Sequence, residues 1–281
     1  MSYRKKSIKS KIDKLRPKKP IFKKLWFWLF ILILITFCSA AYVILFYPKI
    51  QITNILISGN YKILSNNIES LVLNDIKYKI FTLGSWEVNS KSIILVNKTK
   101  IRKNILETFP IAENAIINVV YPNSLTIFIS EKQPLGVFCD NKECYNIDQN
   151  GIIFEKPLSV AEHTLIVRQT ENKKELIIGT NIIDKNTINA ISIIKKTLKD
   201  NNQIDLKEAV INNSLRLNIT TSENWKIYFD LGEGLNIDSQ IVKLNSLLNG
   251  GISNESRNNL RYIDLRPKDR AIVCDNSICG A

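Results

Sequence analysis

The sequence predicts an α+β protein in which one membrane-spanning helix precedes a β-α-α-β-β unit and a second, mixed β-rich domain. Three observations support this prediction. A long segment near the N-terminus carries no charge, about 80 residues after it alternate between strand and helix patterns, and residues from 133 onward are rich in strand patterns.

The predicted membrane helix covers residues 25–47, which contain no charged residue. At about 1.5 Å per residue this segment spans roughly 34 Å, enough to cross a hydrocarbon core of about 30 Å. Residues 1–24 contain eleven Lys and Arg against one Asp, so we expect a cytoplasmic N-terminus with the rest of the chain outside. Trp26, Trp28 and Tyr47 lie at its two ends, where aromatic rings favour the headgroup layer.

A cleavable signal peptide and a lipoprotein are the alternatives for this segment. Ser39-Ala40-Ala41 offers small residues for cleavage, but the apolar run continues to Tyr47 and exceeds the usual 7–15 residues or so. A lipid-modified Cys38 fits poorly because the bulky Phe37 precedes it. A retained anchor is therefore favoured.

The net charge of +13 is concentrated in the N-terminal tail. Residues 1–24 carry +10, which leaves +3 for the remainder of the chain. The tail thus serves topology and attraction to anionic lipid, and we expect residues 1–47 to contact the inner-membrane lipid. A basic, aromatic-rich face is absent from the sequence pattern, so no nucleic-acid partner is predicted.

The first unit after the anchor follows the order β-α-α-β-β. We predict helices and strands there from apolar periodicity, a capping-box pattern at Asn66 and Glu69, and a helix stop at Pro110. The predicted elements are a strand at 50–57, helices at 66–76 and 99–108, and a hairpin of strands at 115–121 and 125–131 joined by a turn at 122–124. This order is typical of helices packed on one face of a sheet.

The second unit is predicted to be strand-rich with two helices. Its clearest elements are helices at 186–199 and 236–249 and strands at 215–220, 225–231 and 262–266. Pro267 follows the last of these, before Ala271-Ile272-Val273. Because proline cannot donate to a ladder, we expect this last strand to lie at a sheet edge.

Four cysteines outside the anchor form two pairs of the same spacing, Cys139 with Cys144 and Cys274 with Cys279. Apolar residues flank a polar turn between Cys139 and Cys144, and a hairpin there would bring the two Cβ atoms together. Local disulfides are the leading interpretation in an oxidising compartment, while a four-thiolate zinc site and free thiols stay open.

The sequence offers no constellation for catalysis. Its single histidine, His163, has no Ser, Asp or Cys context and is interpreted as a surface residue. The cysteine pairs have no matching histidine, which argues against a thiol nucleophile. We therefore predict no enzyme activity, no cofactor, no metal and no small-molecule substrate, and expect the folded module to act by binding proteins through an exposed strand edge.

Six short motifs occur in order behind the basic tail and the apolar segment. They are Ile52-x2-Ile55-x-Ile57-x-Gly59-Asn60, Phe109-Pro110-Ile111-Ala112-Glu113-Asn114-Ala115, Tyr121-Pro122-Asn123-Ser124-Leu125-Thr126-Ile127, Glu131-Lys132-Gln133-Pro134, the segment from Tyr145 to Phe154, and Tyr262-Ile263-Asp264-Leu265-Arg266. Each motif alone is a weak signal, but their order is specific. On these motifs the chain resembles the FtsQ/DivIB family of bacterial cell-division proteins over nearly its whole length.

This resemblance implies a cell-division (divisome) scaffold in the inner membrane. It implies a cytoplasmic tail at 1–24, a transmembrane helix at 25–47, a POTRA domain at 50–132 that helps recruitment, and a periplasmic β-rich domain at 133–281. The expected location is the division septum, as a single-pass type II protein with its bulk in the periplasm, linking early and late division proteins.

The resemblance also implies partners and a site. The family binds the membrane proteins FtsB and FtsL, mainly by adding a partner segment to its last strand, which maps onto 262–274 with Pro267 inside it. The predicted partner-binding residues are Tyr262, Ile263, Asp264, Leu265, Arg266, Lys268, Arg270, Ala271, Ile272 and Val273. A POTRA-containing envelope assembly or secretion factor and a membrane-anchored cell-wall enzyme are the alternative functions.

Overall fold

The computed structural model describes residues 24–281 except 141–142, 171–174, 214, 233–235, 278 and 280–281. Contacts between Cα atoms divide the chain into two compact units. The first comprises residues up to Ile57 together with 69–101 and 117–127, and the second comprises 58–68, 102–116 and 128–281. The basic tail predicted at 1–24 lies almost entirely outside the described residues.

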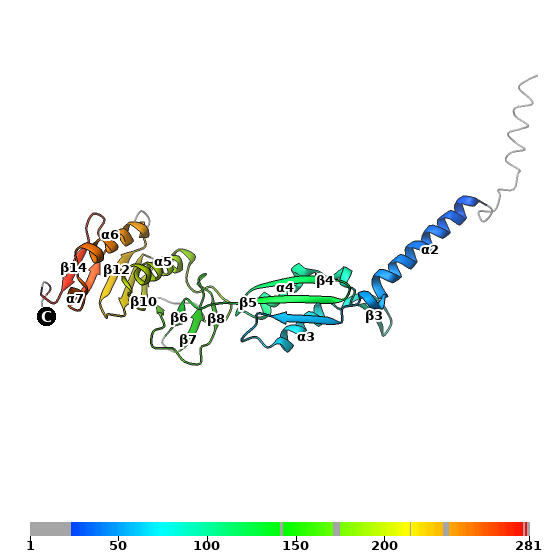
Figure 1. Cartoon of the computed structure of the whole chain (residues 1–281), viewed down its shortest axis with the longest axis horizontal. Helices are drawn as coiled ribbons and strands as arrows, with labels where there is room; N and C mark the ends of the chain where they lie inside the picture. Colours follow the sequence, from blue (N-terminus) through cyan, green and yellow to red (C-terminus); the bar gives the residue numbers. More distant parts are fainter. Residues whose placement is uncertain are drawn as a thin grey trace, which may run out of the picture. The chain divides into compact units, whose positions relative to one another are not determined.

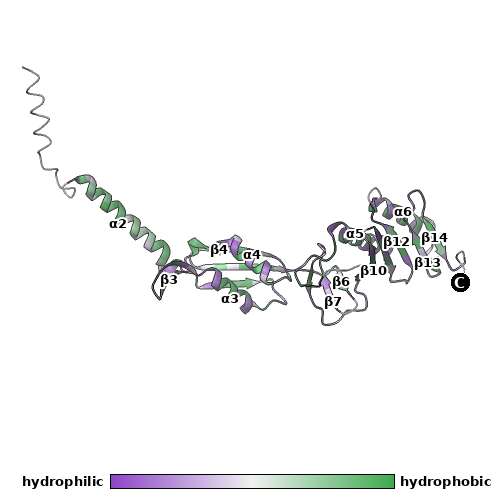
Figure 2. Cartoon of the chain, turned by 180° about the vertical axis from the view of Figure 1, so that it is seen from behind, coloured by the Kyte–Doolittle hydropathy of each residue, from purple (hydrophilic) through white to green (hydrophobic). Residues whose placement is uncertain are grey.

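The predicted membrane helix is present as α2, Leu25–Phe46 (Figure 1). It is a helix of 22 residues, long and apolar enough to cross a membrane, and none of its residues is buried. Figure 2 shows this helix coloured mostly as hydrophobic along its length, as expected of a helix that faces lipid. A short 3-10 turn, η2 at Pro48–Ile50, follows it.

The β-α-α-β-β order is confirmed around a three-stranded sheet in the order β1-β5-β4. The strands are β1 Asn54–Ser58, β4 Ala112–Val120 and β5 Ser124–Glu131, and the helices are α3 Ser65–Asp75 and α4 Lys98–Thr108. The helices bury one face each, with Ile68 and Val72 on α3 and Ile101 and Ile105 on α4 almost inaccessible to solvent. These residues recur at helical spacing, so packing of the apolar stripe accounts for both helices.

Three details of this region differ from the sequence prediction. The first strand begins at Asn54 rather than at residue 50, because η2 precedes it. Helix α3 begins at Ser65, so Asn66 lies in its first turn and does not cap it. A hairpin of β2, Tyr78–Leu83, and β3, Trp86–Ser90, was not predicted, although its two-residue loop contains Gly84 with a positive φ of 61°.

The strand-rich second region is confirmed as one mixed sheet of nine strands in the order β14-β13-β12-β11-β10-β9-β6-β7-β8. Its pairs are antiparallel except β6 with β9, β9 with β10, and β12 with β13. The strands are β6 Gly136–Cys139, β7 Cys144–Ile147, β8 Ile153–Glu155, β9 Ile166–Gln169, β10 Leu206–Asn213, β11 Arg216–Thr221, β12 Lys226–Asp230, β13 Leu260–Asp264 and β14 Ile272–Asp275.

Two long helices cover one face of this sheet, and both follow their predictions closely. They are α5 Lys185–Asn202 and α6 Ile237–Gly250, with the short α7 Asn254–Arg257 after them (Figure 1). Asp184 caps α5 by accepting hydrogen bonds from two backbone N–H groups, and Asn236 caps α6 in the same way with one. Their apolar faces join Trp225 and Phe229 in one core, so the opposite face of β11, β12 and β13 is left to polar residues.

Candidate functional site

The last strand of the described chain, β14, lies at one end of the nine-stranded sheet and pairs only with β13 there. The range 262–274, predicted as one edge strand, is divided between two strands. Strand β13 is flanked by β12 and β14 and is not an edge, whereas β14 is. Pro267 lies in the loop between β13 and β14, where its missing N–H removes no ladder hydrogen bond. The edge at this end of the sheet is therefore β14, which begins five residues after the proline, and β8 is the strand at the other end.

A polar cluster covers the solvent face beside this edge. Asp264 accepts hydrogen bonds from Arg266 Nε at 2.8 Å and from Arg266 Nη2 at 2.5 Å, a two-pronged contact of planar groups. The Arg266 guanidinium lies 5.2 Å from the centre of the Tyr228 ring, and the rings of Tyr228 and Tyr262 are 5.4 Å apart. Tyr228 belongs to β12, and its place in this cluster was missed, although the alternation of 225–231 puts it on the polar face.

Asp264 and Arg266 stabilise each other's charged forms. Burial alone raises the pKa of Asp264, but hydrogen bonds from the Arg266 side chain and backbone N–H outweigh it and hold that pKa below its ordinary value. The hydrogen bond to Asp264 in turn raises the pKa of Arg266. The pair therefore stays ionised and fixes the start of the loop that leads to β14.

Helix α6 holds the same loop from the other side. Lys243 Nζ donates to the carbonyl oxygens of Leu265 at 3.0 Å and Pro267 at 2.7 Å. Because these carbonyls leave the ladder at the end of β13, the ammonium group takes the place of a missing backbone donor. Lys268 and Arg270 remain exposed on the loop.

Both cysteine pairs are disulfide-bonded in the structure. Cys139 and Cys144 are register partners across the β6–β7 hairpin, and their Cα atoms are 4.1 Å apart. Cys274 lies in β14, is 1% exposed, and is bonded to Cys279, where the chain turns back after the edge strand. The second bond therefore limits how far the edge can extend.

The ten predicted partner-binding residues differ widely in their exposure to solvent. Ile263 and Leu265 are 0% exposed and belong to the core, so direct contact of their side chains with a partner does not fit their burial. Ile272 is 42% exposed at the edge itself. Tyr262, Arg266, Ala271 and Val273 are half-buried, Asp264 is buried, and Lys268 and Arg270 are exposed.

A second conspicuous feature is built from the Glu131-Lys132 motif. The Glu131 carboxylate accepts hydrogen bonds from the backbone N–H groups of Tyr61 at 2.8 Å, Lys62 at 2.9 Å and Ile63 at 3.0 Å. Burial raises the pKa of Glu131, but these three donors outweigh it and lower the pKa below the ordinary value. The motif therefore ties β5 to the turn that follows β1.

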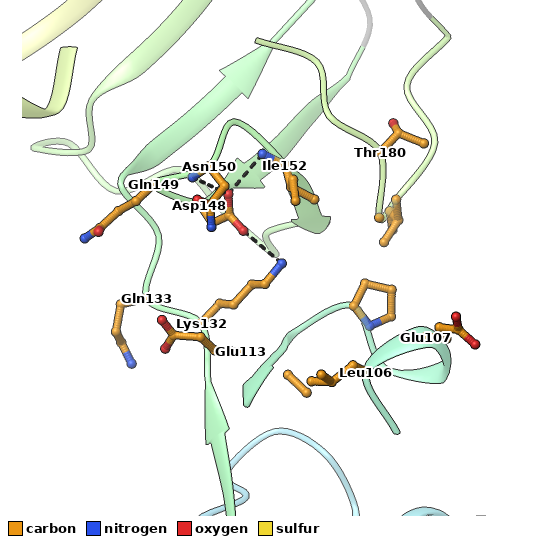
Figure 3. Close-up of a pocket in the computed structure, with 14 residues that line it drawn as sticks. Leu106, Glu107, Glu113, Lys132, Gln133, Asp148, Gln149, Asn150, Ile152 and Thr180 are labelled. Atoms are coloured by element: carbon orange, nitrogen blue, oxygen red, sulfur yellow. Dashed lines mark hydrogen bonds and ion pairs between the residues drawn. The ribbon is translucent and has the colours of Figure 1, made fainter. Parts of the chain in front are cut away.

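The next residue, Lys132, lines a hollow of about 1000 Å³ (Figure 3). Its ammonium lies 2.8 Å from Asp148 Oδ2, and Asp148 Oδ1 accepts hydrogen bonds from the backbone N–H groups of Asn150 and Ile152. The two side chains are 15% and 6% exposed. The two charges thus neutralise each other within the protein, and the hydrogen bonds of Asp148 stabilise the turn between β7 and β8.

The other residues considered for chemistry are the single histidine and groups that could bind a metal. His163 is exposed, as predicted. No group of three or more His, Cys, Asp or Glu able to hold a metal occurs among the described residues. The arrangement that remains distinctive is an accessible sheet edge beside a charged, aromatic cluster.

Comparison with known proteins gives two relatives. The chain is 26% identical over 209 residues to the cell division protein DivIB of Clostridium tetani, which covers 71% of this chain and 76% of the relative. It is 28% identical over 174 residues to the cell division protein DivIB of Clostridium acetobutylicum, covering 61% of this chain and 62%, less than two thirds, of that relative. No family model matches the chain. The resemblance to the FtsQ/DivIB family is confirmed by these two relatives.

Proposed function

We propose that this chain, which is similar to the DivIB cell-division proteins, acts in bacterial cell division as a membrane-anchored, non-catalytic scaffold. Its partners would be division proteins of the membrane, of the FtsB and FtsL type. The relatives support the cell-division role, and the accessible edge at β14 supports a role in binding proteins.

The observation that carries the proposal is the position of β14. One side of its backbone pairs with β13, and no strand of the described chain pairs with the other. Such a strand can accept an extended segment of another protein, with main-chain hydrogen bonds supplying affinity and neighbouring side chains supplying specificity. Ile272 at the edge and Tyr262 beside it would make the side-chain contacts.

The anchor would place this edge where division complexes assemble. In this proposal α2 crosses the inner membrane once, the basic N-terminal tail stays in the cytoplasm, and the folded remainder lies in the periplasm at the septum. The charge asymmetry around α2 supports this orientation. Residues 50–132 would form the POTRA domain that helps recruitment.

The test is co-purification of the partner membrane proteins with the full-length, tagged chain carrying Ile272→Lys. A lysine on an edge strand opposes the addition of another strand, so we expect partner recovery to fall strongly. Ile193→Lys on α5 is the matched control, because Ile193 is 40% exposed against 42% for Ile272. Equal partner recovery with the two variants would refute binding at this edge.

Two other variants refine the test. Charge reversal at Lys268 or Arg270 is expected to weaken binding of an acidic partner segment modestly, since both lie on the rim. Truncation after Arg261 is expected to abolish partner capture. It also deletes the buried Ile263 and Leu265, however, so the point variant is the cleaner experiment.

A further inference from the structure

The β2–β3 hairpin is fastened at its base to the end of the membrane helix. Ser90 Oγ donates a hydrogen bond to the carbonyl oxygen of Leu45 at 2.5 Å, and Ser92 Oγ donates to that of Ile44 at 2.6 Å. The Gln51 side chain donates to the Leu45 carbonyl as well, at 2.9 Å. The last turn of a helix has carbonyls without intrahelical partners, and these three groups satisfy two of them. The hairpin therefore starts at the level where α2 ends (Figure 1).

The hairpin has an apolar side that the protein leaves open. Phe81 and Val88 are register partners, so their side chains lie on one side of the hairpin. Trp86 is two residues before Val88 in the same strand and therefore lies on that side too. Phe81 is 52% exposed and Trp86 is 79% exposed. On the opposite side Glu87 forms an ion pair with Lys79 at 2.5 Å.

Such a hairpin needs something to cover it. The β2–β3 sheet has two strands only, and an isolated two-stranded hairpin with an exposed apolar side is marginal in water. The side chains at issue are aromatic, and Trp in particular is favoured at the headgroup layer of a membrane. The cover that this position offers is the membrane that α2 itself enters.

The turn between β4 and β5 brings another aromatic residue, Tyr121, close to the segment that follows α2. The backbone N–H of Thr53 donates to the carbonyl oxygen of Asn123 at 3.0 Å, and Asn123 Nδ2 donates to Thr53 Oγ1 at 2.9 Å. This holds the β4–β5 turn next to the segment that leaves α2. Tyr121 on that turn is 70% exposed, and Tyr47 at the end of α2 is 43% exposed.

Exposed lysines lie at the hairpin base and just after α2. Lys49 lies in η2 immediately after α2, Lys77 precedes β2, and Lys91 follows β3. Tyr78 and Ser90 are register partners, so Lys77 and Lys91 lie at the hairpin base, close to the end of α2. Lysines near an anionic membrane surface are attracted to it.

We propose that these residues form a membrane foot, made up of Phe81, Trp86, Tyr121, Lys49, Lys77 and Lys91. The foot lies on the headgroup layer of the membrane that α2 spans, with Trp86 and Phe81 among the headgroups and the lysines against anionic phospholipid. The inference rests on α2 being a retained anchor. Its consequence is that the first folded elements are oriented against the membrane rather than only tethered to it.

The test uses tryptophan fluorescence of the full chain in vesicles of phosphatidylcholine and phosphatidylglycerol. The chain has four tryptophans, and Trp26→Phe with Trp28→Phe leaves Trp86 and Trp225. Trp225 is 0% exposed in the core, so it supplies an internal reference for folding. Lipid brominated on the acyl carbons nearest the headgroup should quench the Trp86 component and spare that of Trp225, and adding Trp86→Phe should remove the quenching.

Failure of the foot and failure of the anchor give different results. With Trp86→Phe alone, quenching of Trp26 and Trp28 reports whether α2 lies in the bilayer. If these are quenched while Trp86 in the Trp26→Phe/Trp28→Phe protein is not, the foot is refuted and the anchor stands. If Trp26 and Trp28 escape quenching, the anchor is refuted and the foot with it.

The lysines are tested separately with the triple variant Lys49→Gln/Lys77→Gln/Lys91→Gln in the Trp26→Phe/Trp28→Phe background. We expect quenching of Trp86 to increase with the phosphatidylglycerol fraction in the parent protein and to lose most of that dependence in the triple variant. Quenching that is independent of phosphatidylglycerol in the parent would refute the contribution of the lysines.

Discussion

The carboxylate of Glu131 should stabilise the turn at residues 61–63 by a measurable amount. It accepts three backbone hydrogen bonds, from Tyr61, Lys62 and Ile63, at distances between 2.8 and 3.0 Å. Glu131→Gln keeps one acceptor oxygen but removes the charge, while Glu131→Ala removes the acceptor altogether. The three donors belong to one turn, so loss of the acceptor should open it locally.

The magnitude follows from the number and exposure of these bonds. A typical intramolecular hydrogen bond contributes about 1 kcal/mol net, and because the contacts of Tyr61 and Lys62 are exposed we use this value for each of the three bonds rather than the about 1.5–3 kcal/mol of a bond to a charged group. We expect Glu131→Ala to lower the local opening free energy by about 3 kcal/mol and Glu131→Gln by about 1 kcal/mol. At about 1.4 kcal/mol per factor of ten, amide exchange at residues 61–63 should accelerate about hundredfold in Glu131→Ala and about fivefold in Glu131→Gln.

The dependence on pH gives a second prediction from the same contact. The folded-state pKa of Glu131 is lowered, so its stabilisation is fully present above the unfolded value of about 4.3 and is lost as pH falls through the lower, folded-state pKa. Glu131→Gln should remove that acid-dependent part.

The assay is amide hydrogen exchange of the full-length protein followed at peptides covering residues 61–63. Glu113→Gln and Glu113→Ala on β4 are matched controls, because Glu113 is an exposed glutamate of the same sheet. Unchanged exchange in Glu131→Ala, or equal acceleration in the Glu113 variants, would refute the argument.

The remaining predictions concern three other contacts. Asp148→Ala should lower the free energy of unfolding, measured with urea, by about 3 kcal/mol. Lys132→Met should lower it less, because Asp148 also accepts two backbone hydrogen bonds that this variant keeps. Equal losses in the two variants would contradict this. Lys243→Met should remove the ammonium donor from the carbonyls of Leu265 and Pro267 and lower the free energy of unfolding by about 1–2 kcal/mol. The check is amide exchange, which should become faster in residues 265–275 and stay unchanged in α5. Gly59→Ala should lower the melting temperature far more than Gly84→Ala. Both have positive φ, but a Cβ at 59 overlaps the Ile129 carbonyl oxygen whereas one at 84 meets open space.

Local patterns sufficed for much of the fold. The anchor followed from the uncharged stretch, and α5 and α6 matched their predicted ranges within a few residues because apolar spacing and capping residues agree there. The β6–β7 hairpin followed from a polar turn between apolar ends. The β2–β3 hairpin could have been found from its glycine loop, but its strands carry no apolar run long enough to compete with the helix signals around them.

The sequence by itself determined the membrane span, the four long helices α3, α4, α5 and α6 and several of the strands, because those depend on periodicity, charge and turn residues within short windows. It could not determine which strand lies at the edge. Pro267 predicts one edge strand over residues 262–274, whereas the sheet places β14 outside β13 and puts the proline in the loop between them. Only the tertiary structure could bring Glu131 to residues 61–63, Lys243 to the loop after β13, and Ser90 and Ser92 to the end of α2. Those contacts join residues far apart in sequence, and their pairing is fixed by packing of the whole domain rather than by any local preference.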